Sequence, residues 1–236
     1  MTRTGEGLAV VRQNDSTMPS ETPELSGVFT PYRAGALAGV SGYRLGQWAR
    51  YDLVRPSRYR GRPANLYDFH DVAEAIVVHW LLDERFSYRQ IHEAIHAARA
   101  EHPDWPLLMA PLGIAHHAVE GDPIGTIVLE VERGVYIDTH RGGQVTLRPE
   151  LLDHVRDMLK RGGWLANELD LRRIEVDPAK LAGAPTLRGR RWPVERVAQL
   201  AGDDAGVSVL LDDYGLDERD VDESRRWVAA AAALSL

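Results

Sequence analysis

The stretch from Tyr32 to Pro63 carries seven arginines and one acid, a net charge of +6 in a chain whose formal net charge is −7. The arginines are Arg33, Arg44, Arg50, Arg55, Arg58, Arg60 and Arg62, and the acid is Asp52. A local reversal of charge of this size is typical of a surface that binds a polyanion. The alternative is a solvated face whose arginines only keep the protein dispersed.

Two groups of side chains in this stretch have the chemistry to bind DNA. Arginine, glutamine and tyrosine hydrogen-bond base edges and phosphates. The first group recurs at helical spacing and consists of Tyr43, Arg44, Gln47 and Arg50. All four are expected to face DNA, and Tyr43, Arg44 and Gln47 are expected to contact the bases. The second group alternates with Ser, Tyr and Gly and is expected to contact the adjacent phosphates or the minor groove: Arg58, Arg60 and Arg62.

A helix-turn-helix would position the first group. Ala34, Leu37 and Ala38 give a short helix with one apolar face, and residues 39–41 form a tight corner in which Ser41 is suited to cap the next helix. Leu45, Trp48 and Ala49 then give a second apolar face at i, i+3, i+4. Two short helices joined by a glycine-containing corner are typical of this motif. The segment RPSRYRGRP that follows predicts a β-hairpin wing.

The rest of the chain predicts a mainly α protein with a small β insert (α+β). Asp68 is expected to cap a helix over 70–84, and Ser87 with Gln90 forms a capping box that opens a helix to about residue 101. Short β-like runs at 124–131, 135–138 and 145–147 predict an antiparallel meander. A helix over 149–160 is expected to end at Gly162-Gly163, and a strand at 173–176 precedes helices over 193–201, 207–214 and 218–233.

The N-terminal pattern resembles the winged helix of the MerR family over about residues 29–102. The matching residues, in the family's order, are Tyr32, Leu37-Ala38, Val40-Ser41, Leu45, Trp48 with Tyr51, Leu53-Val54, Pro56, Tyr67, Asp71-Val72 and Phe86-Ser87 with Ile91. The resemblance implies a winged helix-turn-helix that binds DNA. The chain departs from the family where Gln47 to Tyr51 replaces the usual Arg-Tyr-Tyr. The usual dimerising coiled coil is also missing, because His102-Pro103 and Trp105-Pro106 interrupt the pattern.

The C-terminal pattern resembles a second family over roughly residues 173–233. Its residues are Gly183, Pro185, Gly189, Arg191, Pro193 and Val194. They match the small trihelical domain of unknown function that recurs in bacterial antitoxins, beside genes for PIN-domain ribonuclease toxins, although Arg190 and Trp192 replace the family's usual Thr and Ile. Together the two resemblances imply a VapB-type antitoxin of the larger kind. Such a protein neutralises a PIN-domain ribonuclease and represses its own operon. The alternative is a MerR-like transcriptional regulator whose C-terminal half binds a small molecule or dimerises.

The trihelical region is acidic, which favours protein contact over DNA contact. Residues 194–227 hold ten acids and four arginines, a net charge of −6 that repels phosphate. A PIN ribonuclease holds magnesium with carboxylates, so an arginine can take the place of the metal ion. Two arginine pairs lie beside an apolar anchor: Arg190 and Arg191 with Trp192, and Arg225 and Arg226 with Trp227. The second set is favoured because a terminal segment reaches a cleft more easily. The alternative is that Arg191 holds its turn together and that Arg225 and Arg226 balance Asp222 and Glu223.

No catalytic residues, metal site or cofactor are predicted, and the chain is not expected to be an enzyme. It has no cysteine, which excludes disulfides and thiolate zinc sites. His92 and His96 have a zinc-binding spacing without an evident third ligand, while the adjacent His116 and His117 rarely share one ion. The expected partners are operator DNA, a PIN-domain toxin and a second copy of the chain, with no membrane and a cytoplasmic location.

Four regions are predicted along the chain. They are a disordered leader (1–27), a winged helix-turn-helix domain (28–104), a β insert with a connecting helix (105–170) and a trihelical domain (171–236). The winged helix-turn-helix domain and the trihelical domain, which is also helix-turn-helix-like, are expected to pack independently of each other.

Overall fold

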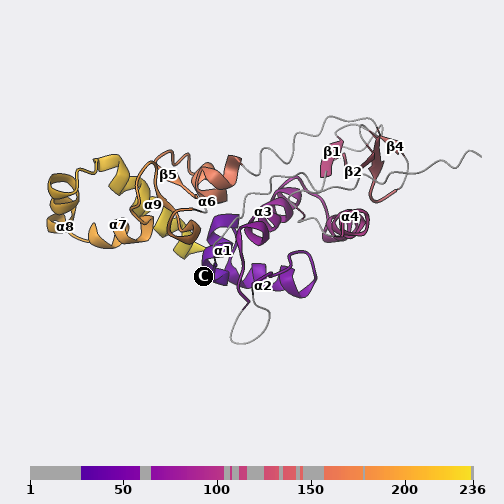
Figure 1. Ribbon diagram of the computed structural model, residues 1–236, viewed down its shortest axis with the longest axis horizontal. Coiled ribbons are helices and arrows are strands. Elements are labelled where there is room, and N and C mark those ends of the chain that lie inside the picture. Colours follow the sequence, from indigo (N-terminus) through magenta and orange to yellow (C-terminus); the bar gives the residue numbers. More distant parts are fainter. Residues whose placement is uncertain are drawn as a thin grey trace, which may run out of the picture.

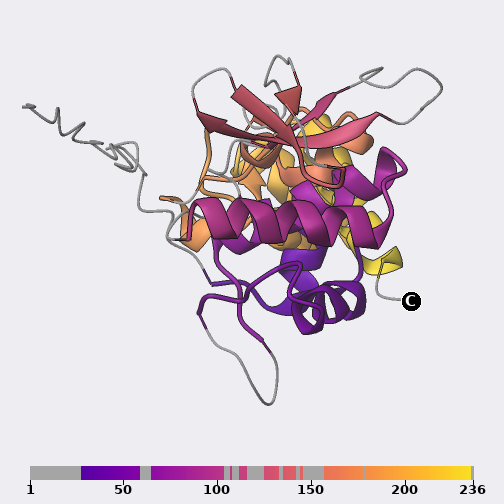
Figure 2. The same ribbon diagram turned by 90° about the vertical axis from the view of Figure 1, so that its right-hand side faces the viewer.

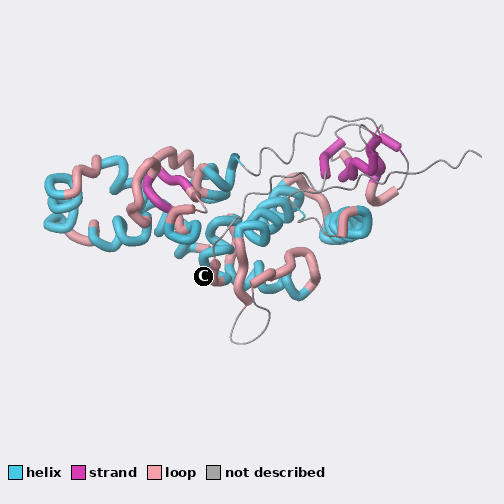
Figure 3. Tube along the Cα trace, in the orientation of Figure 1, coloured by secondary structure: helices cyan, strands magenta, loops and turns pink. Residues whose placement is uncertain are grey.

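The computed structural model describes residues 28–58, 65–103, 107, 112–115, 125–132, 135–141, 144–145, 157–177 and 179–234. The predicted leader, Arg60 and Arg62 of the predicted wing, His116, His117 and residues 149–156 lie outside these ranges. The described part is mainly α with a small antiparallel sheet, which confirms the predicted fold class (Figure 3). No helix in this part of the chain is long and apolar enough to cross a membrane.

The predicted helix-turn-helix is present as α1 (Pro31–Ala38) and α2 (Gly42–Arg50). Thr30 caps α1, and Gly39 ends it in the left-handed conformation at φ 71°. Ser41 caps α2 as predicted, with its Oγ accepting from the Arg44 amide at 3.1 Å. Leu45 and Trp48 are buried, so the opposite side of α2 faces solvent.

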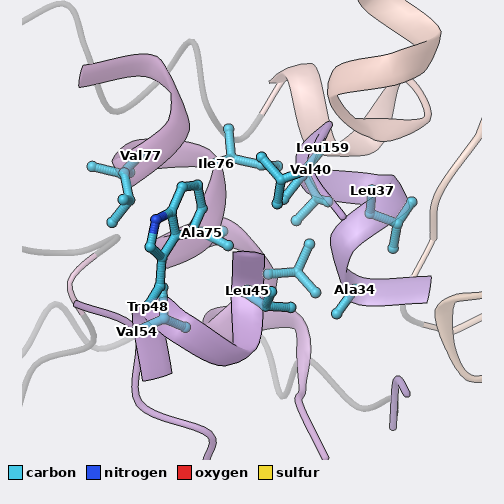
Figure 4. Close-up of a cluster of buried hydrophobic side chains, with 14 of the residues drawn as sticks. Ala34, Leu37, Val40, Leu45, Trp48, Val54, Ala75, Ile76, Val77 and Leu159 are labelled. Carbon is cyan, nitrogen blue, oxygen red and sulfur yellow. The ribbon is translucent and has the colours of Figure 1, made fainter. Parts of the chain in front are cut away.

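Two longer helices support this pair, α3 (Phe69–Asp83) and α4 (Tyr88–Glu101). Both predicted caps are present: Asp68 with Asp71 forms one capping box, and Ser87 with Gln90 forms the other. Figure 4 shows the core that α1, α2 and α3 share, which includes Leu37, Trp48 and Ile76.

Four strands form a meander in the order β1 (Leu112–Ala115), β2 (Thr126–Glu132), β3 (Val135–Asp138) and β4 (Gln144–Val145), all antiparallel. The sequence predicted the last three and missed β1. Ile127 and Leu129 join the main core, and the sheet lies over α4 (Figure 2).

The structure differs from the sequence prediction at Gly162 and Gly163. These glycines were expected to close a helix, and residues 157–160 are indeed helical. They also begin a second helix, α6 (Gly163–Glu168), which the sequence did not predict. Both glycines are left-handed, with φ 103° and φ 80°, so they turn the chain sharply instead of ending it in a loop.

The C-terminal region starts with a two-stranded ribbon. It consists of β5 (Ile174–Glu175) and β6 (Thr186–Leu187), with the 3₁₀ turn η2 (Leu181–Gly183) between them. The helices that follow are α7 (Val194–Leu200), α8 (Asp204–Ser208), the π-helical turn η3 (Val209–Asp213) and α9 (Glu218–Ala233). The molecule is elongated in Figure 1, with α8 at one end and the β1–β4 sheet at the other.

The C-terminal region packs directly against the helix-turn-helix, so the expectation of independent packing does not hold. Leu159, Leu165 and Trp227 belong to the same buried cluster as Leu37 and Phe29. An ion pair also crosses the boundary: Arg33 Nη2 on α1 lies 2.6 Å from Glu195 Oε2 on α7. A smaller second cluster, with Val197 and Leu210 among its members, is formed by the C-terminal region alone.

Candidate nucleic-acid interface

The solvent side of α2 carries the first group of predicted DNA-binding residues. Tyr43 is 79% exposed, Arg44 and Arg50 are exposed, and Gln47 is half-buried. The Arg50 Nη1 donates to Gln47 Oε1 at 3.4 Å, so these two side chains lie together on one face of the helix. The structure therefore brings all four residues of this group to one exposed surface, where their donors and acceptors are available to a partner.

Three arginines of the basic stretch pair with acids of the same molecule, and the pair that Arg58 forms with Asp68 is the longest of the three. Arg33 pairs with Glu195, as described above. Arg55 Nε and Nη2 form two bonds to the carboxylate of Asp52, at 2.8 and 2.7 Å. The charge available to a polyanion is therefore smaller than the sequence count, and it is concentrated on α2 and on the segment that follows Arg55.

A buried carboxylate fixes the segment that leads toward the predicted wing. Asp71 Oδ2 accepts from the amide and hydroxyl of Ser57, both at 2.9 Å, and from the Asp68 amide at 2.8 Å. Arg58, with a side chain 47% exposed, lies 3.6 Å from Asp68. The start of α3 thus positions Arg58, the one residue of the second predicted group that the structure describes.

A second buried carboxylate, Glu74, lies next to Arg99. Glu74 accepts from Arg99 Nη2 at 3.2 Å, from the Arg55 amide at 3.2 Å and from the Leu107 amide at 3.1 Å. Burial raises the pKa of Glu74 and lowers the pKa of Arg99, while the mutual attraction of the two charges opposes both shifts. The pair joins α3, α4 and the loop after α2, and so holds α2 against its support.

The Asp71 carboxylate predicts an unusual pH dependence of stability. Burial, helped by the neighbouring Asp68 charge and opposed by hydrogen bonds, raises its pKa to about 6 from 3.8. The folded state therefore binds this proton more tightly than the unfolded state, so stability falls as pH rises from about 4 to about 6.5. Asp71→Asn keeps an acceptor for Ser57 and removes the titration. Relative to wild type, we expect the free energy of unfolding of the variant to increase by about 2 kcal/mol between pH 4.5 and pH 7.5. Urea unfolding at both pH values checks this. The same change in the free energy of unfolding in wild type and variant would contradict it.

A cavity of about 810 Å³ lies between α2 and α4, and we refer to it as the α2–α4 cavity. Its lining adds residues from outside the predicted interface, which the sequence analysis missed: Tyr51, Leu53, Tyr88, Arg89 and His92. Tyr88, an exposed aromatic residue directly after Ser87, was the available signal. Only the folded chain shows that α2 and α4 form the two sides of one cavity.

The predicted toxin-binding residues occupy different environments. Arg191 is exposed, and Trp192 is half-buried with its ring 4.9 Å from that of Tyr214. The neighbouring Arg190 donates to the Gly215 carbonyl at 2.9 Å. These residues lie at the surface beside the β5–β6 ribbon.

In the second set, Trp227 is only 1% exposed and belongs to the main core, so it is not available as a surface anchor. Arg225 donates to the Ala201 carbonyl, and Arg226 donates to the Leu169 carbonyl at 3.0 Å. Arg226 also lies 3.8 Å from Asp222, as the charge-balance alternative predicts. Both arginines are exposed, although these contacts hold α9 to the rest of the fold.

Comparison with known proteins relates only part of the chain to a family. The family model described as a protein of unknown function, DUF433, matches residues 174–226. No curated protein matches the sequence. A crystal structure of Rv2018 from Mycobacterium tuberculosis covers 85% of this chain and 96% of its own, at 18% identity and a TM-score of 0.46. That likeness is too low to carry an argument.

Proposed function

We propose that this protein is the antitoxin of a toxin-antitoxin pair, which binds operator DNA through α2 and neutralises a PIN-domain ribonuclease. The observation that supports DNA binding is the exposed face of α2, with Tyr43, Arg44, Gln47 and Arg50 opposite a fully buried Leu45 and Trp48. In a helix-turn-helix the second helix enters the major groove, where arginine and glutamine discriminate between bases. The resemblance of the C-terminal pattern to a domain of bacterial antitoxins supports the second activity.

Arg44→Ala is expected to reduce discrimination between the operator and a shuffled duplex by about 1–3 kcal/mol, since an arginine at a base edge contributes specificity. Wild-type affinity should fall with salt at a log–log slope of about −5 if a dimer neutralises roughly six phosphates. Fluorescence anisotropy with the promoter of the protein's own operon measures both quantities.

The matched control for Arg44→Ala is Arg196→Ala. Arg196 lies on α7 and donates to Gln199 Oε1 at 2.8 Å, an i, i+3 pair like that of Gln47 and Arg50 on α2. We expect this variant to leave both the affinity and the salt slope unchanged. Equal losses in the two variants, or wild-type binding that does not depend on salt, would contradict the DNA-binding proposal.

For neutralisation we propose the surface formed by Arg191, Trp192 and Tyr214. Arg191 is exposed, and the two aromatic side chains beside it, which meet edge to face, offer an apolar anchor, a combination typical of interface hot spots. An arginine there can meet the carboxylates of an empty magnesium site. This replaces the sequence-based preference for the second set, because Trp227 lies in the core.

Arg191→Glu should abolish co-purification with the ribonuclease encoded beside this chain and restore the toxicity of that enzyme, because the reversed charge repels the acidic site. Operator binding should stay intact. The control is Arg172→Glu, an arginine whose side chain is 81% exposed and pairs with Asp170. Full neutralisation by the Arg191→Glu variant would discard the proposed surface, and the absence of any such neighbouring ribonuclease would discard the antitoxin role.

A further inference from the structure

The α2–α4 cavity has the size and the floor of a small-molecule site. Its volume of about 810 Å³ lies within the usual range of ligand pockets. Trp48 and Leu53 line it and are 1% and 2% exposed, so they form its floor. A duplex resting on the exposed face of α2 meets the rim of such a cavity, while a small planar molecule can reach the floor.

The walls of the cavity are aromatic. Tyr43, Tyr51 and Tyr88 are 79%, 64% and 49% exposed, so three of the eight large hydrophobic side chains exposed in the described part of the chain gather here. The Trp48 indole Nε1 donates to Tyr88 Oη at 3.4 Å, which connects the floor to the α4 wall. Aromatic faces held around a recess favour a flat ring, which stacks on them in offset or edge-to-face geometry.

The charge of the lining is positive. Arg44 from α2 and Arg89 from α4 line the cavity, and none of its described lining residues is a carboxylate. The Arg89 guanidinium lies 4.0 Å from Glu93 and 3.4 Å from His140 Nε2, and with its side chain 74% exposed it stays accessible. Two arginines beside aromatic walls match a ligand that joins a flat ring to an anionic group.

We propose that the α2–α4 cavity binds a planar aromatic anion, either an aromatic acid or a nucleotide, and that this ligand excludes DNA from α2. The exclusion follows because Tyr43, Arg44 and Gln47 line the cavity and also form the proposed DNA-reading face. The claim that the cavity binds such a ligand, the ligand-binding half of the proposal, depends only on the cavity. The claim that the ligand excludes DNA, the exclusion half, rests on the proposed DNA-binding function. The ligand would act as an inducer that releases the operator.

Calorimetric titration of the full chain tests the ligand-binding half. The probes are naphthalene-2-sulfonate, AMP and the neutral naphthalene-2-sulfonamide. We expect at least one anion to bind with a Kd of about 0.1 mM or below and the sulfonamide to bind at least tenfold more weakly. Tighter binding of AMP than of the sulfonate identifies a nucleotide site, and the reverse identifies an aromatic-acid site. Failure of both anions to saturate, or equal binding of the sulfonamide, overturns the proposal.

Variants on α4 locate the site. Tyr88→Ala and Arg89→Ala should each weaken anion binding at least fivefold, and Tyr88→Phe, which keeps the ring, should bind normally. Tyr214→Ala and Arg172→Ala, an exposed tyrosine and an exposed arginine elsewhere, serve as matched controls. Unchanged binding in Arg89→Ala, which lies on the surface and should fold, overturns the assignment even if Tyr88→Ala is unstable.

Competition tests the exclusion half. A tenfold excess of the anion over its Kd should raise the apparent Kd for the operator about tenfold. Undisturbed operator binding at that concentration overturns exclusion. Tyr88→Ala and Arg89→Ala should leave operator affinity unchanged without ligand, and a loss as large as that of Arg44→Ala would assign the cavity to the DNA interface instead. If the protein binds no operator at all, the DNA-binding proposal fails while the titrations still decide whether the ligand site exists.

Discussion

Replacing Arg99 with methionine is expected to lower the free energy of unfolding by about 3–5 kcal/mol, the usual cost of leaving a buried charge without its partner. The side chains of Arg99 and Glu74 are 11% and 9% exposed. The Arg99 guanidinium also donates to the carbonyl of Asp52 at 2.6 Å, so the variant loses this hydrogen bond as well. Most of the loss arises from Glu74, which must stay ionised without its countercharge or take up a proton.

Adding Glu74→Gln to Arg99→Met should recover at least half of that loss. Glutamine carries no charge, and its one side-chain oxygen still accepts from one of the two amides, of Arg55 and Leu107, that the two oxygens of Glu74 hold at 3.2 and 3.1 Å. Arg172→Met removes a fully exposed pair with Asp170 and should leave the urea midpoint unchanged. Urea unfolding at pH 7.5 compares the three variants, and an Arg99→Met midpoint equal to that of Arg172→Met would show that the buried pair does not stabilise the fold.

Gly163→Ala is expected to lower the free energy of unfolding by about 3 kcal/mol, because two penalties add at this position. Its φ of 80° is unfavourable for any residue with a Cβ, and a Cβ there would lie 2.5 Å from the carbonyl oxygen of Leu37. That oxygen belongs to the backbone of α1 and cannot move aside without separating α1 from α6.

Gly215→Ala measures the cost of the left-handed conformation without the steric clash that is added at Gly163. Gly215 is also left-handed, at φ 61°, and a Cβ there would meet nothing within 4 Å. We expect this variant to lose only about 1 kcal/mol, the cost of the conformation alone. Thermal and urea unfolding of both variants measure the difference. Equal losses would mean that the approach of α6 to α1 contributes nothing to stability.

Local signals in the sequence predicted most of the helices and their starts. Ser41, Asp68 and Ser87 each cap the helix that they were expected to cap, because a cap depends only on the next three residues. The sequence did not predict α6, since two adjacent glycines are typical of a helix end and nothing local shows that the chain turns into another helix. The packing of α6 on α1 joins residues more than a hundred positions apart, and such contacts leave no periodic pattern.

The candidate interface was also predicted only in part, because its local patterns are visible in the sequence and its contacts between distant segments are not. The exposure of Tyr43 and Arg44 follows from the apolar face of α2, which is local. The role of Trp227 was misjudged because its place near the C-terminus suggested a segment that reaches into a partner's cleft, whereas the side chain lies in the core. A buried stripe of Val221, Ser224, Trp227 and Ala231 runs along α9 at helical spacing, and this spacing was the available signal for the core position of the tryptophan. The α2–α4 cavity depends on how two helices meet, which the sequence alone does not show.

The shared core also sets the order in which the protein becomes functional during its synthesis. The α1–α2 unit leaves the ribosome early, but part of its packing surface is covered by Leu165 and Trp227, which are made much later. A growing chain therefore carries the proposed DNA-binding unit with exposed apolar surface until Leu165 and Trp227 have emerged. We expect stalled nascent chains that end before α6 to be bound by chaperones and to bind DNA poorly. Packing of α9 against the core would then act as a late step in building the proposed DNA-binding unit.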